Sequence, residues 1–172
     1  MAVNLFRTIE RTSVGILALA LLACCPSAAE TQQSCSWLNA ATAEGFLGGP
    51  VTITVTGDSK PFGDATCEFV RQQDKQVSKL RIEVDTVAQP HDAFATYAGH
   101  CGHQSAPMTA IGNEAVICSR KEKHHVVAER VVGRVRDRIF LLDVSSNVPH
   151  ADQANLQKTA EQISQQVAGI LF

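Results

Sequence analysis

The sequence predicts an α+β domain in which helices cover one face of an antiparallel sheet. Residues 79–87 alternate strictly, with Leu80, Ile82 and Val84 apolar and charged residues between them, as in a strand with one face in water. Residues 156–171 repeat apolar side chains at the helical period of 3.6. Short turn-forming segments separate consecutive strand patterns, which favours antiparallel pairing.

The first half of this domain is predicted to be a helix followed by three strands. Ser36 is the predicted N-cap of the helix, and Gly48-Gly49-Pro50 ends it. A turn-rich segment over residues 57–64 separates the first strand from the second. Alternation of apolar and polar side chains places the three strands at residues 51–56, 66–69 and 79–87.

The second half repeats this order. Pro90 begins a helix that runs to Cys101, and residues 102–113 contain too much Gly and Pro for a long regular element. The last helix begins after Pro149. Strands are predicted at residues 115–119, 125–135 and 139–145, the last two forming a hairpin around Arg136-Asp137-Arg138. The order is α-β-β-β-α-β-β-β-α, with a sheet of about five to six strands. Two alternative explanations of this repetition are an old duplication and coincidence.

The first 29 residues are predicted to be a signal peptide. Arg7 and Arg11 precede an apolar run over residues 14–25, which is shorter than the roughly 20 residues of a membrane-spanning helix. Residues 27–29 (Ser-Ala-Ala) are the small residues of a cleavage site. We therefore expect a secreted or periplasmic protein without a membrane span, in which residues 30–172 form one disulfide-bonded domain.

An alternative cleavage site would leave a lipid-anchored envelope protein. Residues 21–24 (Leu-Leu-Ala-Cys) resemble a bacterial lipoprotein processing site, at which Cys24 would receive the lipid. Leu22 is bulky for that pattern, and Cys25 would remain as an odd thiol. Cleavage after Ala29 removes both cysteines and leaves an even number, so we favour the product without an anchor.

Four cysteines remain in the predicted mature domain, and an oxidising compartment favours disulfides between them. Four cysteines allow three connectivities. Cys101 ends a helical apolar stripe shortly before Cys118 on a short strand, which favours a Cys101–Cys118 bond. Cys35–Cys67 would then tie the first helix to an early strand. No cysteine belongs to a CxxC pair, so a thiol nucleophile or metal ligand is the weaker interpretation.

Several packing and turn motifs occur together over most of residues 34–172. They are residues 35–38 (CSWL), 47–49 (LGG), 67–69 (CEF), 111–116 (IGNEAV), the hairpin 131–144 and residues 167–169 (VAG). With these motifs the chain resembles an uncharacterised family of secreted and lipid-anchored bacterial envelope domains, which is similar to extracellular sensor-type domains of membrane kinases. The resemblance implies a cell-envelope role with an unknown ligand or protein partner, and it transfers no catalytic residue.

Two histidines suggest a metal site. His100 and His103 stand three residues apart and could present two imidazoles from one helix face to Zn²⁺ or Cu²⁺. His91 or the pair at residues 124–125 would have to complete the ligand set. The competing interpretation is that these are surface histidines at the polar end of a helix, because no acidic ligand stands at helical spacing from them.

Charge is unevenly distributed along the chain. Lys+Arg 15 against Asp+Glu 17 gives a net charge of −2, which provides no reason to expect nucleic-acid binding. Residues 120–138 nevertheless contain seven basic residues against three acidic ones. Arg130, Arg134, Arg136 and Arg138 could form a face for an anionic envelope component or an acidic partner. The alternative is a solvated face that prevents edge strands from pairing.

Catalytic motifs are absent from the sequence. It contains no G-x-S-x-G elbow, HExxH, phosphate-binding glycine loop or Rossmann fingerprint, and Glu114 follows a simple Gly112-Asn113 turn. We therefore predict a non-catalytic binding or interaction module of the bacterial envelope without a cofactor. A small exported metal-binding protein using His100 and His103 is the alternative. A hydrolase is the third hypothesis, because catalytic groups can assemble from distant positions.

Overall fold

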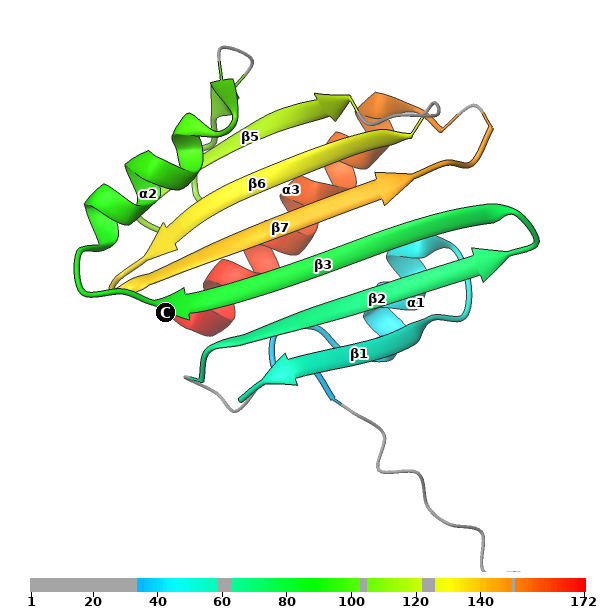
Figure 1. Ribbon diagram of the computed structural model, residues 1–172, viewed down its shortest axis with the longest axis horizontal. Coiled ribbons are helices and arrows are strands. Elements are labelled where there is room, and N and C mark those ends of the chain that lie inside the picture. Colours follow the sequence, from blue (N-terminus) through cyan, green and yellow to red (C-terminus); the bar gives the residue numbers. More distant parts are fainter. Residues whose placement is uncertain (1–33, 59–62, 103–104, 122–125, 150) are drawn as a thin grey trace, which may run out of the picture. The chain divides into compact units, whose positions relative to one another are not determined.

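The computed structural model describes residues 34–172 except residues 59–62, 103–104, 122–125 and 150. In this part of the chain, one antiparallel sheet of seven strands has the order β1-β2-β3-β7-β6-β5-β4 and is accompanied by three helices (Figure 1). The predicted α+β class with an antiparallel sheet is confirmed. The predicted signal peptide (residues 1–29) and Cys24 lie outside the described residues.

The first half consists of α1 (Ala40–Leu47), β1 (Thr52–Gly57), β2 (Ala65–Gln73) and β3 (Gln76–Thr86). Asn39, not the predicted Ser36, caps α1, since its side chain accepts a hydrogen bond from the Thr42 amide. Ser36 lies too early because Trp37 and Leu38 are buried in the core before the helix begins. Gly48, at a φ of 78°, ends the helix in the left-handed conformation.

The second half consists of α2 (Pro90–Gly99), β4 (Ser105–Pro107), β5 (Glu114–Lys121), β6 (Val127–Val135), β7 (Arg138–Ser146) and α3 (Gln153–Leu171). Strand β4 has no counterpart among the predicted elements, which is why only five to six strands were expected. This strand has three residues and pairs only with β5 at the edge of the sheet, where Pro107 is tolerated. Arg138, predicted in the hairpin turn, is the first residue of β7.

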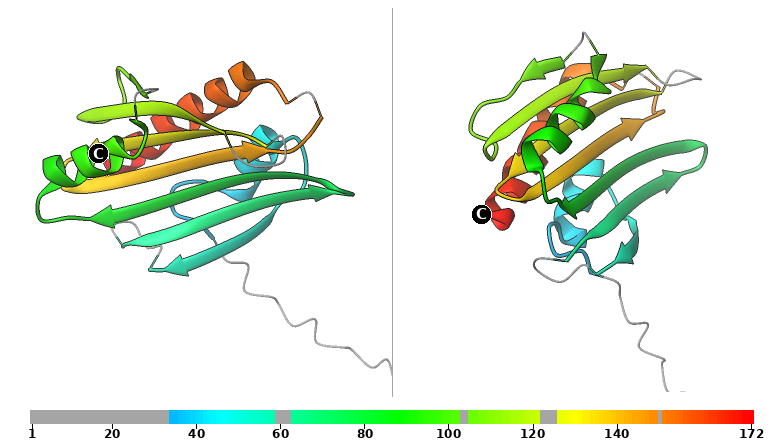
Figure 2. Two further views of the ribbon diagram at one scale, coloured as in Figure 1. Left: turned by 45° about the horizontal axis from the view of Figure 1, so that its top comes forward. Right: turned by 60° about the vertical axis from the view of Figure 1, so that its left-hand side comes forward.

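The helices lie on both faces of the sheet, so the prediction of a single covered face is wrong. The cluster that contains α1 and α3 also contains Val131 and Phe140, whereas Phe94 of α2 packs with Val132 and Ile139. Figures 1 and 2 show α2 in front of β5, β6 and β7 with α1 and α3 behind. The reason is that β6 and β7 carry an apolar patch, Val132, Ile139 and Leu141, on the face opposite the main core, whereas the corresponding face of β3 is charged.

The predicted repetition extends to the strands but not to the helices. The order β1-β2-β3-β7-β6-β5 places the two three-strand sets symmetrically on either side of the β3–β7 pair. A two-fold axis normal to the sheet would relate them and would keep both preceding helices on one face. Because α1 and α2 lie on opposite faces, the pseudo-symmetry is confined to the strands.

Two disulfides fix the helical layers to the sheet. Cys35–Cys67 joins the segment before α1 to β2, and Cys101–Cys118 joins the segment after α2 to β5. The predicted disulfide-bonded framework is therefore confirmed, with the two pairs that local spacing favoured. Disulfides are typical of proteins from oxidising compartments. None of the helices in the described residues has both the length and the hydropathy needed to cross a membrane.

Candidate functional site

A row of polar side chains crosses one end of the sheet on the face covered by α1 and α3. Arg71 of β2 lies directly opposite Ser78 of β3, and Ser78 lies directly opposite Ser146 of β7. The neighbouring row on the same face consists of Phe69 and Leu80, both fully buried, and Val144 beyond them. The apolar core therefore gives way to polar groups at the Arg71–Ser78–Ser146 row.

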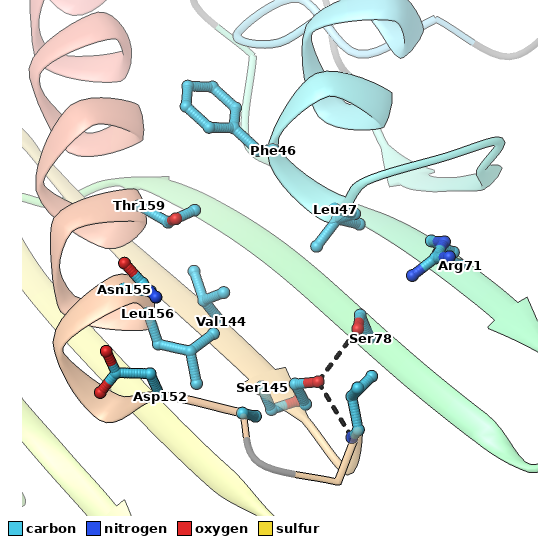
Figure 3. A pocket seen from close by; sticks show the side chains of 13 residues that line it. Phe46, Leu47, Arg71, Ser78, Val144, Ser145, Asp152, Asn155, Leu156 and Thr159 are labelled. Carbon is cyan, nitrogen blue, oxygen red and sulfur yellow. Dashed lines mark hydrogen bonds between the residues drawn. The ribbon is translucent and has the colours of Figure 1, made fainter.

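A pocket of ≈ 230 Å³ opens over this row, between the C-terminal end of α1 and the N-terminal end of α3 (Figure 3). Side chains from both helices and from three strands converge on it. Its apolar wall consists of Phe46, Leu47, Val144, Val148, Ala151 and Leu156. Its polar wall consists of Arg71, Ser78, Ser145, Ser146, Asp152, Asn155 and Thr159.

The two serines of the row form a buried pair of hydroxyl groups, and one of the two hydroxyl hydrogens is not used in the bond between them. Their Oγ atoms are 3.1 Å apart, and the Val148 amide donates to Ser146 Oγ at 3.2 Å. Each hydroxyl has one hydrogen, and one of the two lies in the bond between the serines. In the described part of the chain, no acceptor takes the second hydrogen, so the Ser78–Ser146 pair retains one donor at the pocket.

Arg71 brings a positive charge to the same pocket. Its Nη2 donates to the side-chain oxygen of Gln73, and no carboxylate pairs with it among the residues that the structure describes. Its aliphatic and Nε atoms lie against the glycine turn that ends α1, where a Cβ on Gly49 would come 2.9 Å from Nε. Arg71 as a whole is half-buried, so water screens its charge less than it screens a fully exposed one.

Asp152 is the one acidic residue among the described residues that line the pocket. It is the N-cap of α3, and its carboxylate accepts a hydrogen bond from the Ala154 amide at 3.1 Å. Figure 3 shows Arg71 and Asp152 on opposite sides of the pocket, with Ser78 between them. The helix N-terminus therefore compensates the Asp152 charge, whereas the hydrogen-bond partner of Arg71 in the described residues is the neutral amide of Gln73.

A second cavity of ≈ 290 Å³ lies between β4 and α3 and is less suited to a ligand. Its α3 side presents Gln157, Glu161 and Gln165. Gln157 donates to Glu161 Oε1 at 3.1 Å, so these two groups already satisfy each other. No cationic side chain lines this cavity in the described residues, and its wall therefore offers no charged donor.

The histidines proposed for a metal site are not brought together in the described residues. His100 is exposed just after α2, and His103 and residues 124–125 lie outside the described part. His91 lies 3.0 Å from Glu114 Oε1 instead. No group of three His, Cys, Asp or Glu side chains in the described residues could hold a metal ion. The metal hypothesis on His100 and His103 stays a prediction.

Glu114 belongs to a small ionic cluster between α2 and the sheet. The Arg134 guanidinium contacts its Oε1 at 2.6 Å, on the side of the carboxylate shared with His91. The hydrogen bond from His91, followed by the bond and charge of Arg134, holds the pKa of Glu114 below its usual range. The cluster links the first turn of α2 to β5 and β6 and therefore helps to hold α2 on the sheet.

The arginines of the predicted anion face have different environments. Arg130 makes two bonds to the Asp143 carboxylate, at 2.6 and 2.7 Å, and Arg134 is paired with Glu114. Arg138 is buried. These charges are therefore largely engaged within the fold.

Arg136, the fourth of these arginines, occupies the β6–β7 turn. Its guanidinium lies over the Phe172 ring at 5.9 Å from the centroid. Binding of an anion or an acidic partner to these arginines stays a prediction.

Sequence patterns provided little indication of the groups that the structure gathers at the pocket. Ser78 shares the strand parity of Leu80, so its inward direction was available from the alternation. Arg71 and Ser146 join it only through strand register. Glu129 was also missed: it is 2% exposed and accepts hydrogen bonds from Ser119 Oγ at 2.9 Å and from Gln153 of α3.

The fold and the pocket define a disulfide-bonded α+β domain with one mixed polar and apolar site between two helices. The chain matches no family model, and no curated protein or solved structure is significantly similar to it. The function must therefore be inferred from the residues of the chain and the geometry of the pocket.

Proposed function

We propose that the protein is an exported binding module whose ligand occupies the pocket between α1 and α3. The main support is the Ser78–Ser146 pair, a buried donor at the foot of an apolar wall in a pocket of ≈ 230 Å³. Ligand sites typically combine a mainly apolar lining with a few placed polar groups that fix orientation. The pocket is small for such a site, so the ligand is a small molecule and not a polymer segment.

Binding is favoured over hydrolysis by the contacts of the pocket side chains. Ser78 bonds to Ser146, and Ser146 accepts the Val148 amide. A serine nucleophile requires a base within hydrogen-bond reach. In the described residues neither serine contacts a histidine or a carboxylate, and Asp152 is engaged with the start of α3.

The site of action in this proposal is the bacterial cell envelope or its surroundings. The signal-like residues 1–29, the two disulfides and the resemblance to secreted envelope domains support it. The processed form begins at residue 30, and a lipid-anchored form on Cys24 is the alternative. Mass spectrometry of the processed N-terminus distinguishes them: a free N-terminus at Glu30 supports our preference, and an acylated Cys24 overturns it.

The binding proposal is tested by filling the pocket. Asn155 is an exposed α3 residue that lines it, so Asn155→Trp should obstruct the pocket without disturbing the core. Gln162→Trp makes the same change at an exposed α3 position outside both cavities and is the matched control. We expect compounds from a small-molecule screen, followed by NMR, to bind the wild type and the Gln162 variant only. Equal binding to the Asn155 variant, or no binding to the wild type, would overturn the proposal.

A further inference from the structure

We infer that the ligand of this pocket is a small amphipathic anion. Its anionic group would meet Arg71 and the Ser78–Ser146 pair, and its apolar group would lie against Leu47 and Leu156. This inference rests on the proposed binding function and adds the chemical class of the ligand. Its support comes from hydrogen-bond capacity, from the distribution of charge, and from the size of the apolar part of the pocket.

Unused donors are concentrated along the Arg71–Ser78–Ser146 row. A guanidinium has several N–H groups and no acceptor, and Arg71 donates to Gln73. The serine pair contributes one further hydroxyl hydrogen on the adjacent strands. A carboxylate or a phosphate monoester offers the acceptors that such a row of donors requires, and charged acceptors form the stronger bonds.

The charges around the pocket also favour an anion at this row. Arg71 is the one cation that lines the pocket in the described residues, and its partner is a neutral amide. The opposing charge, Asp152, lies across the pocket and is compensated by the first turn of α3 (Figure 3). An anion beside Arg71 would therefore gain a charge-assisted bond without displacing an ion pair.

The remaining wall sets the apolar part of the ligand. Leu47 and Leu156 face the pocket from the two helices, and Val144 lies on the strand between them. An apolar cavity of about 150 Å³ admits benzene. A volume of ≈ 230 Å³ accommodates a group of that size together with a headgroup, and it is too small for a long acyl chain.

Arg71 also has a structural neighbour that the test must separate from a ligand role. It lies against the Gly48-Gly49 turn at the C-terminus of α1, where a cation compensates the negative end of the helix dipole. Removal of Arg71 would lower the melting temperature in either case. Only a ligand role predicts that removal of Arg71 weakens the binding of an anion more than it weakens the binding of a neutral molecule of the same shape.

The experiment compares four probes by calorimetry and NMR: hexanoate, the neutral hexanamide, the cationic hexylammonium and the short acetate. We expect hexanoate to bind the full chain about tenfold more tightly than hexanamide, since an ionic partner roughly doubles the strength of a hydrogen bond. Acetate should bind more weakly than hexanoate because it lacks the apolar tail. Arg71→Gln should abolish the hexanoate preference and leave hexanamide affinity unchanged. The same measurement with hexyl phosphate in place of hexanoate shows whether the pocket prefers a phosphate monoester or a carboxylate.

Arg81→Gln is the matched control, since Arg81 is an exposed arginine on the opposite face of β3 and should leave binding unchanged. Equal affinity for hexanoate and hexanamide, tighter binding of hexylammonium, or no binding of any probe would overturn the anion inference. Unchanged hexanoate affinity in the Arg71 variant would also overturn the inference, and the role left for Arg71 would be stabilisation of the C-terminus of α1. If that variant fails to fold, the wild-type comparison of the probes decides. The pocket-filling test on Asn155 does not depend on the charge of the ligand. Failure of the binding proposal can therefore be distinguished from failure of the anion inference.

Discussion

Gly133 of β6 lies directly opposite Phe140 of β7, and the phenyl ring occupies the space that a side chain at position 133 would need. A Cβ on Gly133 would come 2.2 Å from two ring carbons. Phe140 is fully buried between the sheet and the helices behind it, so the ring has no room to move aside. Absence of a side chain at 133 is therefore a packing requirement of the core.

We expect Gly133→Ala to reduce the free energy of unfolding by about 2 to 3 kcal/mol, as overpacked cores generally do. Urea denaturation followed by circular dichroism measures this loss. Gly45→Ala is the control, because Gly45 is exposed within α1 and a Cβ added there would have no other atom within 4 Å. That change should stabilise the protein by about 0.5 to 1 kcal/mol. A Gly133 variant as stable as the wild type would refute this account of the Phe140 packing.

Glu114 should stabilise the fold above mildly acidic pH. Its pKa is lowered in the folded state by the hydrogen bond from His91 and by Arg134, so its contribution is lost as the pH falls through the folded pKa. Glu114→Gln should therefore cost up to about 1 kcal/mol at neutral pH, the usual limit for a pair near the surface, and nothing in strong acid. Chemical denaturation at several pH values measures the difference. A cost that stays constant with pH would contradict the ionic explanation.

Asp85 should have the opposite effect. Burial, then the neighbouring charges of Glu83 and Asp64, raise the pKa of Asp85, so its carboxylate is costly above the folded pKa and the cost disappears as the pH falls through it. Asp85→Asn should raise stability at neutral pH by a fraction of a kcal/mol, the scale typical of partly exposed charges. Melting temperatures across the acidic to neutral range test this. A loss of stability at neutral pH would show that a favourable contact of Asp85 outweighs the repulsion.

The strands that the sequence predicted well are those with one wet face. In β3 the alternation of Leu80 and Ile82 with Arg81 and Glu83 indicated both the element and its inward side. In β7 every residue from Arg138 to Leu142 is buried, so alternation could not indicate that α2 would cover the second face. The opposite placement of α2 follows from tertiary packing on β6 and β7, and no local pattern in α2 encodes it.

The pocket could not be predicted because its parts are distant in sequence. Arg71 and Ser78 meet across a hairpin, but Ser146 joins them only through the β3–β7 pairing, which brings together residues 68 positions apart. Local alternation determines which side of a strand a residue occupies, whereas register between distant strands determines its neighbours. The disulfide-bonded framework was easier to predict than the pocket, because four cysteines allow only three pairings and two of the four cysteines lie close together in sequence.

Helix α2 is the element that the Cys101–Cys118 bond should protect. Phe94 is its one buried residue, and the cluster beneath it contains only Val132, Ile139 and Leu141 as buried partners. An element with so few buried contacts opens at a lower free energy than the main core does. The bond fixes the chain just after α2 to β5, at a sequence separation of 17 residues.

Replacing Cys101 and Cys118 together by Ala should therefore lower the free energy of unfolding by about 3 kcal/mol, the value expected for a loop of this length. Hydrogen exchange should accelerate first in α2, because the remaining contacts of the helix are few. The matched control replaces Cys35 and Cys67, whose separation of 32 residues predicts a similar or slightly larger loss of stability. In that variant the accelerated exchange should appear around α1 and β2 and spare α2. Uniform acceleration across the sheet in both variants would show that α2 and the sheet unfold as one unit, against the local role assigned to the Cys101–Cys118 bond.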